Sequence, residues 1–115
     1  MLPKQERGVS FSATVQSTAN AVASVAAGGA NTIHYITDIS GSADKNGATI
    51  TVRSGGTTLW QDQLAMPYSL ATTNIPYTRS FVSPLAAGTN TAVTVTVGSA
   101  SSLSWANVSG FTIVF

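Results

Sequence analysis

The sequence predicts an all-β chain: a single antiparallel β-sandwich of about seven or eight strands, with jelly-roll or related Greek-key connections. Three observations support this prediction. Short runs of residues alternate between apolar and polar, turn signals rich in glycine and proline separate these runs, and no stretch has a convincing helical period. With 115 residues, the chain can bury a core without a metal ion or disulfide bonds.

The first eight residues differ from the rest of the chain. They hold three of the nine charged residues and a proline, and they show no periodic pattern. We therefore expect a flexible N-terminal arm over residues 1–8 and one β-sandwich domain over residues 9–115.

The first part of the domain contains two strand signals and one ambiguous stretch. Residues 9–16 alternate in period two, so their apolar side chains share one face. Residues 19–27 fit a helix with Thr18 as its cap and Gly28 as its stop, and they also fit a strand of small residues. The strand signals on both sides favour the strand. Residues 31–41 are rich in β-branched and aromatic side chains and predict the next strand.

The segment TITVRSGGTTLWQDQ, residues 49–63, predicts a β-hairpin. Gly55 and Gly56 are expected to supply the positive φ values that a primed two-residue turn requires. Arg53 and Asp62 lie on the two predicted strands. An ion pair between them, worth about 0.2–1 kcal/mol, would help to fix the register of the hairpin.

The second part of the domain predicts three further strands. Residues 65–76 contain two prolines and no period, which indicates a long connection. Residues 77–83 predict a strand that ends at Pro84, and residues 91–97 alternate cleanly between threonine and valine or alanine. Residues 109–115 predict the last strand. Three of its apolar side chains share one face: Phe111, Ile113 and Phe115.

Composition and charge argue against several classes of function. Charged residues make up 8% of the chain, against roughly 25% in an ordinary soluble domain, while Ser and Thr together supply 31 of the 115 residues. The five cations are scattered along the sequence, so we expect no nucleic-acid partner. The chain has no cysteine and no apolar run of the roughly 20 residues that span a bilayer, so we expect neither a thiolate metal site nor a membrane partner.

The residues needed for hydrolytic catalysis are sparse. The one histidine, His34, is followed by Asp38, and on a regular strand the two side chains would share a face about 13 Å apart. That separation prevents the carboxylate from orienting the imidazole as in a catalytic triad. We therefore interpret His34 as a strand residue at a wet surface or a subunit contact. The three aspartates outside the arm lie near turns or strand ends, which does not favour an acid–base pair.

The phrase SADKNG, residues 42–47, is similar to the start of a calcium-binding loop. Such a loop needs a bidentate glutamate at its twelfth place, which here is Arg53. A cation at the coordinating position excludes calcium, and the phrase is better explained as a turn. We therefore assign no catalytic residue, no metal ligand and no cofactor-binding residue, and we expect no cofactor.

The aromatic side chains remain as candidates for a contact surface. Aromatic anchors dominate the energetics of interfaces, which makes four residues candidates for contact with a partner: Trp60, Trp105, Tyr68 and Tyr77. The alternative is that the two tryptophans cap the ends of the core.

Four phrases in a fixed order carry a resemblance to known proteins: AVASVAAGGANTIHYITDISGSA, ATITVRSGGTTLWQ, SFVSPLAAGTNTAVTVTVGSA and WANVSGFTI. Over roughly residues 19–114 they resemble small β-sandwich virion proteins of tailed bacteriophages. The resemblance implies a capsid decoration (cement) protein or a small accessory protein of the head or tail. It further implies a homo-oligomer, often a trimer, that is made in the host cytoplasm and located on the virion. The phrases contain no functional motif, so the resemblance assigns no site residue.

The function expected from the sequence is therefore structural rather than enzymatic. We expect a bacteriophage capsid decoration protein that binds the major capsid protein or other virion proteins and stabilises the shell through many weak contacts. The alternative is a receptor-binding or carbohydrate-binding module attached to the head or tail. A third hypothesis, a small hydrolase built around His34, is the least favoured.

Overall fold

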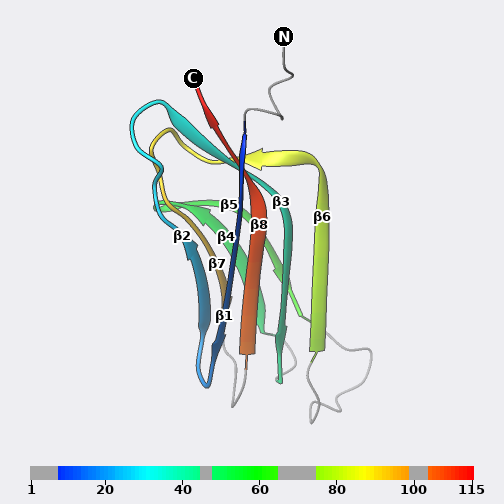
Figure 1. Cartoon of the computed structure of the whole chain (residues 1–115). Helices are drawn as coiled ribbons and strands as arrows, with labels where there is room; N and C mark the ends of the chain where they lie inside the picture. Colours follow the sequence, from blue (N-terminus) through cyan, green and yellow to red (C-terminus); the bar gives the residue numbers. More distant parts are fainter. Residues whose placement is uncertain (1–7, 45–47, 65–74, 99–103) are drawn as a thin grey trace.

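The structure of the chain, a computed structural model, describes residues 8–44, 48–64, 75–98 and 104–115. These residues form eight strands, in chain order β1 (Val9–Ser17), β2 (Ala21–Val25), β3 (Thr32–Ala43), β4 (Thr49–Ser54), β5 (Thr57–Gln63), β6 (Ile75–Ala86), β7 (Val93–Gly98) and β8 (Ser104–Val114). The strands lie in two four-stranded antiparallel sheets that pack face to face (Figure 1). The predicted all-β sandwich is confirmed.

The strand order is that of a jelly roll. One sheet has the order β1-β8-β3-β6 and the other β2-β7-β4-β5, so that every connection crosses between the sheets except the β4–β5 hairpin. The first and last strands are hydrogen-bonded neighbours, paired from Val9 with Thr112 to Ser17 with Ser104. The topology therefore selects the jelly roll from the two architectures that the sequence left open.

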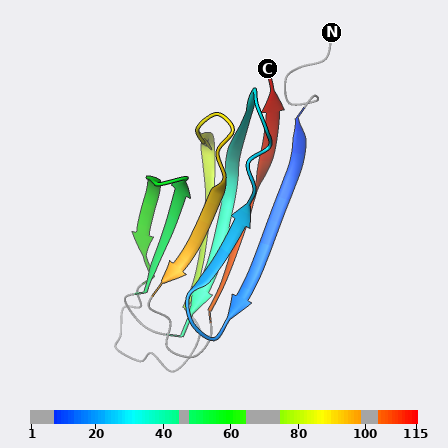
Figure 2. The same cartoon turned by 90° about the vertical axis from the view of Figure 1, so that its left-hand side faces the viewer.

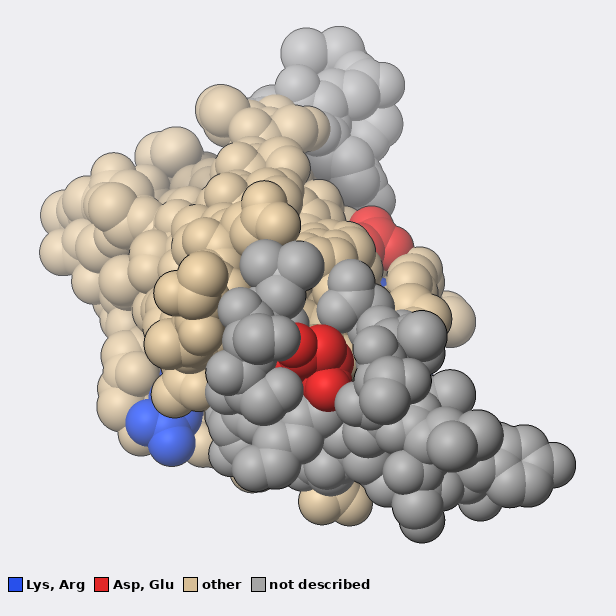
Figure 3. Space-filling view, turned by 90° about the horizontal axis from the view of Figure 1, so that it is seen from below, with Lys and Arg blue, Asp and Glu red and all other residues tan. Residues whose placement is uncertain are grey.

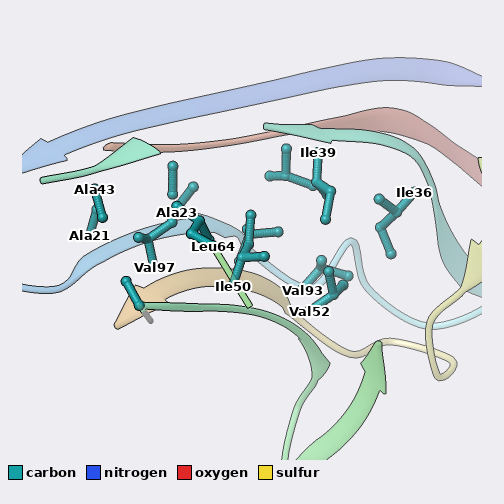
Figure 4. Close-up of a cluster of buried hydrophobic side chains, with 14 of the residues drawn as sticks. Ala21, Ala23, Ile36, Ile39, Ala43, Ile50, Val52, Leu64, Val93 and Val97 are labelled. Carbon is teal, nitrogen blue, oxygen red and sulfur yellow. The ribbon is translucent and has the colours of Figure 1, made fainter. Parts of the chain in front are cut away.

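The core lies between the two sheets and is built from aliphatic side chains (Figure 4). In β7 the valines alternate with threonines, and Val93, Val95 and Val97 are fully buried, as the period-two pattern predicts. Ala21 and Ala23 of β2 are also fully buried. The strand interpretation of the ambiguous stretch is thus confirmed for Ala21–Val25.

A bulge in β3 changes which side chains face the core. The pairing of β3 with β8 shifts between Ile36 and Asp38, which leaves Thr37 as an extra residue. The buried inward row is even-numbered before the bulge and odd-numbered after it: Thr32, His34 and Ile36, then Ile39, Gly41 and Ala43. Ser42, between the last two, is buried as well. The prediction that His34 and Asp38 share a face is therefore wrong, because the bulge turns them to opposite faces.

Gly110 of β8 makes room for this bulge. It lies opposite Ile36, and a Cβ at this position would overlap the carbonyl oxygen of Tyr35. Only glycine allows the two backbones to approach so closely. The bulge thus depends on a residue that is far away in the sequence.

Of the strands, β6 and β8 extend furthest beyond their predicted bounds. β6 continues beyond Pro84 to Ala86, and β8 begins at Ser104, five residues before the predicted start. β6 is an edge strand, where a proline removes no ladder hydrogen bond, and Figure 1 shows it bending sharply towards its end.

The β4–β5 hairpin forms as predicted, with two differences in detail. Only Gly55 has a positive φ, of 57°, as in a turn with one left-handed residue at its first central position. The predicted ion pair is wrong, because the hairpin pairs Arg53 with Thr58 next to the turn and pairs Asp62 with Ile50 further along the strands.

Several predictions concern residues outside those that the structure describes. They are the N-terminal arm up to residue 7, the turn at residues 45–47 and Tyr68 in the long connection. Where the chain is described, no helix is long and apolar enough to cross a membrane.

Candidate interaction surfaces

Trp60 lies at the edge of the sandwich between β5 and β6. It pairs with the fully buried Val52, so its side chain is on the inward face of its sheet. Its ring centroid is 5.8 Å from that of Tyr77 and 5.7 Å from that of Phe81, both on β6 of the opposite sheet. Figure 2 shows the tip of the β4–β5 hairpin standing away from that sheet. The three rings thus link the two sheets where they diverge, and all three pack against the core.

Two charged side chains complete this group, which we call the Trp60 cluster: Trp60, Asp62, Tyr77, Arg79 and Phe81. The guanidinium carbon of Arg79 lies 5.7 Å from the centroid of the Trp60 ring and 5.9 Å from that of Phe81, within the range of cation–π interactions. The Tyr77 hydroxyl donates a 2.8 Å hydrogen bond to the Asp62 carboxylate.

The hydrogen bond between Tyr77 and Asp62 shifts both pKa values. The bond from Tyr77, followed by the backbone N–H of Gln63, lowers the pKa of Asp62. Burial, followed by the hydrogen bond to Asp62 and its charge, raises the pKa of Tyr77 to about 12. At neutral pH the pair is therefore a phenol that donates to a carboxylate.

A second surface lies on the outer face of the β1-β8-β3-β6 sheet. Because His34 and Thr112 face inwards, their neighbours along the strands face outwards. Tyr35 and Phe111 are paired on adjacent strands and stack with ring centroids 5.3 Å apart and an interplanar angle of 16°. We call the four large side chains that gather here the outer apolar patch: Ile33, Tyr35, Phe111 and Ile113.

The sequence prediction found half of the outer apolar patch. It placed Phe111 and Ile113 on one face, but it neither assigned that face to the outside nor included Ile33 and Tyr35. A signal was available in residues 104–110. Ala106 and Val108 alternate with polar residues and are buried, so the residues of opposite parity, Phe111 among them, have to face outwards.

Polar side chains occupy another part of this outer face. Asp38 accepts hydrogen bonds from the hydroxyls of Ser80, at 2.6 Å, and Thr37, at 2.9 Å. The Thr14 hydroxyl donates to the Asn107 side chain at 2.8 Å. Apolar and hydroxyl-bearing side chains therefore occupy different parts of one sheet face.

Trp105 belongs to the outer face and not to the end of the core. It is aligned with Gln16 of β1 and Ser42 of β3, while its neighbours Ser104 and Ala106 are fully buried. Of the predicted contact residues, Trp60 and Tyr77 come together at the β5–β6 edge, and Trp105 lies apart from them on the outer face.

His34 is buried and has partners for both ring nitrogens. Its exposed fraction is 5%, and the edge of the Phe11 ring packs against it at a centroid distance of 5.2 Å. Nε2 lies 2.8 Å from the Ala26 carbonyl oxygen and Nδ1 lies 2.6 Å from the Thr112 hydroxyl. A carbonyl only accepts, so Nε2 carries a proton. The interpretation of His34 as a residue at a wet surface is wrong. Its two hydrogen bonds hold the β2–β3 connection against the sheet.

Charged groups are thinly spread where the molecule is seen from below. Figure 3 shows the acidic and basic side chains of the described residues as small, separate groups. The described residues on this face form no basic patch of the kind that tracks a phosphate backbone.

Comparison with known proteins gives similarity at the level of the fold. No family model matches the chain, and no curated protein matches its sequence. Among solved structures, the K3 adhesin domain of Lys-gingipain from Porphyromonas gingivalis has a TM-score of 0.39 and 16% identity over 81% of this chain. The insecticidal delta-endotoxin Cry8Ea1 from Bacillus thuringiensis has a TM-score of 0.44 and 11% identity over 94% of this chain.

A third similar structure is VP2 of infectious bursal disease virus, from a subviral particle, with a TM-score of 0.38 and 17% identity over 96% of this chain. The chain spans 62%, 19% and 33% of the adhesin domain, the endotoxin and VP2 respectively, which is less than two thirds in each case. None of the three is a bacteriophage protein. These similarities are distant, and they assign no function.

Proposed function

We propose that this chain is a non-enzymatic structural protein of a virus particle, a bacteriophage capsid decoration (cement) protein that docks on the shell and stabilises it. The observation that carries this proposal is the outer apolar patch. Its four large side chains form two cross-strand pairs, Ile33 with Ile113 and Tyr35 with Phe111, and each is half-buried on the outer face of the sheet. Contiguous apolar surface of this kind marks sites of contact with other proteins.

The mechanism that fits this surface is distributed contact. A flat sheet face rich in hydroxyls and poor in charge can lie against a protein surface without burying unpaired ions. Each contact is weak, and many copies on a symmetric shell add up through avidity. The partner would be the major capsid protein or another virion protein, and the location would be the capsid surface.

The polar groups most suited to catalysis are occupied by structural hydrogen bonds, which supports a binding role. Both ring nitrogens of His34 and both carboxylate oxygens of Asp38 have partners within the chain. A general base needs a free nitrogen or oxygen that can reach a substrate.

The decisive experiment is mass spectrometry of purified particles from cells that produce this protein. We expect the protein at a stoichiometric copy number relative to the major capsid protein. Its absence from the particles would remove the proposal.

The docking face is tested by rebinding of purified variants to particles that lack the protein. Replacing Phe111 with Ser and Ile113 with Thr should reduce the bound fraction about tenfold, since burial of large side chains supplies most of the energy of such contacts. The control is Val22→Thr, because Val22 is 42% exposed on β2 of the other sheet. Equal binding of the patch variant and the control would show that another surface docks.

The Trp60 cluster favours one alternative, a carbohydrate-binding or receptor-binding module. It combines aromatic rings with a carboxylate and a guanidinium, the groups that sugar-binding sites use. A glycan array separates the two proposals. Binding that is lost in Trp60→Ala would support the alternative, and a negative array with Trp60→Ala changing only stability would support the decoration protein.

A further inference from the structure

Among the described residues, each sheet ends in two edge strands that pair with a neighbouring strand on one side only. They are β1 and β6 in one sheet and β2 and β5 in the other. An open edge is a template for pairing with another chain, and natural proteins block it with short strands, prolines, charges or bulges. The four edges of this molecule differ in how far they are blocked.

Three of the edges carry such blocks. β2 has only five residues. β5 loses its register with β4 at Leu59 and carries Asp62. β6 contains Pro76 and Pro84, presents Arg79, and departs from regular pairing with β3 between Ser80 and Leu85.

β1 carries none of them. Its nine residues, VSFSATVQS, include no charge, proline or glycine, and they pair with β8 without a register shift. In Figure 2 it forms the margin of the described molecule, with no strand beyond it. Its inward row also leaves apolar surface uncovered, because Val9 is 67% exposed and Val15 is 37% exposed. The edge is therefore long, free of bulges, uncharged and apolar on its inner side.

We propose that β1 pairs with β1 of a second copy of this chain, antiparallel and about a two-fold axis at Ala13. The strand is complementary to itself in this arrangement. Pairing over its full length places Val9 opposite Ser17 of the second copy and Phe11 opposite Val15 of the second copy. The inward rows of both strands then lie on one side, and no like charges meet, since the strand has none.

The pairing would join two four-stranded sheets into one sheet of eight strands. It would satisfy the free backbone groups of both β1 strands and cover Val15 from the side. The two outer apolar patches would then lie on one continuous face. This contact makes a dimer, which differs from the trimer that the resemblance implies, and it does not depend on the proposed function.

The first test is the mass of the full chain in solution, by light scattering after size exclusion over a range of concentrations. We expect a dimer of twice 11.7 kDa. Val15→Lys should raise the dissociation constant about tenfold or more, because an ammonium group would be buried in the new contact. The matched control is Val22→Lys, at a valine of similar exposure on β2, which should leave the dimer unchanged. A monomer, a trimer, or an equal loss in both variants would overturn the proposal.

The second test fixes the register. The chain has no cysteine, so Ala13→Cys would place one cysteine opposite its own copy. Directly opposed residues of antiparallel strands lie about 4.5–5.5 Å apart at Cα, which is within the range that a disulfide bond spans. Under mild oxidation Ala13→Cys should form a covalent dimer, and Val22→Cys should not.

Equal cross-linking of the two cysteine variants would contradict the pairing. Circular dichroism of each variant checks that it is folded. If Ala13→Cys does not fold, the comparison of Val15→Lys with Val22→Lys decides the question by itself.

Discussion

Two aromatic groups near opposite edges of the sandwich pack beside polar groups, and they differ in where the polar atoms find hydrogen-bond partners. Near β1, Phe11 and His34 meet in a buried contact, and both imidazole nitrogens bond to groups inside the chain. Between β5 and β6, Trp60 packs against Tyr77, and the hydrogen bond from Tyr77 to Asp62 is exposed. A buried polar group needs an internal partner for each of its atoms, whereas a group at an open edge can leave some of them to water.

The difference follows from how closely the sheets approach each other. β1 packs against β2 of the other sheet, to which a short turn joins it. The tip of the β4–β5 hairpin stands away from the opposite sheet, so only large rings bridge that side (Figure 2). We therefore expect substitutions near β1 to act through lost hydrogen bonds and those near β5 through lost apolar contact.

The largest effect is expected for His34→Ala. It removes a 95% buried ring and leaves the Ala26 carbonyl and the Thr112 hydroxyl without their partner. We expect a loss of about 3 kcal/mol in the free energy of unfolding, measured by urea denaturation. Thr112→Val removes only one of the two bonds and should cost about 1 kcal/mol. A smaller loss for His34→Ala than for Thr112→Val would contradict the role given to His34.

A smaller effect is expected for Trp60→Ala. The ring is half-buried, so we expect a loss of about 2 kcal/mol, below the range for a fully buried tryptophan. The matched control is Trp105→Ala, on the outer face, which should cost less than about 1 kcal/mol. Chemical denaturation of both variants gives the comparison. Equal losses would show that Trp60 does not bridge the sheets.

The smallest effect at neutral pH is expected for Tyr77→Phe, which keeps the ring and removes the bond to Asp62. The difference in stability between the wild type and Tyr77→Phe should change in the alkaline range. Because the pKa of Tyr77 is raised to about 12 in the folded chain, the neutral phenol is favoured there, and this stabilisation is complete below pH 10 and lost as the pH rises through about 12. Thermal unfolding of the wild type should therefore shift downwards between pH 10 and 12 by more than that of Tyr77→Phe. Equal shifts in the thermal unfolding of the two proteins over this pH range would contradict the expectation.

Most of the fold could be predicted from local patterns. The alternation in β7 identified the buried valines, and the glycine pair identified the hairpin turn. These predictions succeed because the side chains of a strand alternate between its two faces, so that a buried row has period two in the sequence.

The candidate surfaces could be predicted only in part. Asp62 was expected to meet Arg53 across the hairpin, and instead it bonds to Tyr77 of the opposite sheet. His34 was assigned to a wet surface because a strand pattern does not say which face is covered. Trp105 was a candidate core cap and lies on the outer face.

By itself, the sequence determined the strand class, the buried rows and the scarcity of charge, because each depends on residues near one another in the chain. Only the tertiary structure decided which side-chain row of each strand faces the core and which faces outwards. The bulge at Thr37 changes that face within β3, and it exists because Gly110, 73 positions further along the chain, leaves room for the backbone of Tyr35. A close approach between two distant backbones leaves no periodic trace in either segment, so it becomes visible only when the strands are paired.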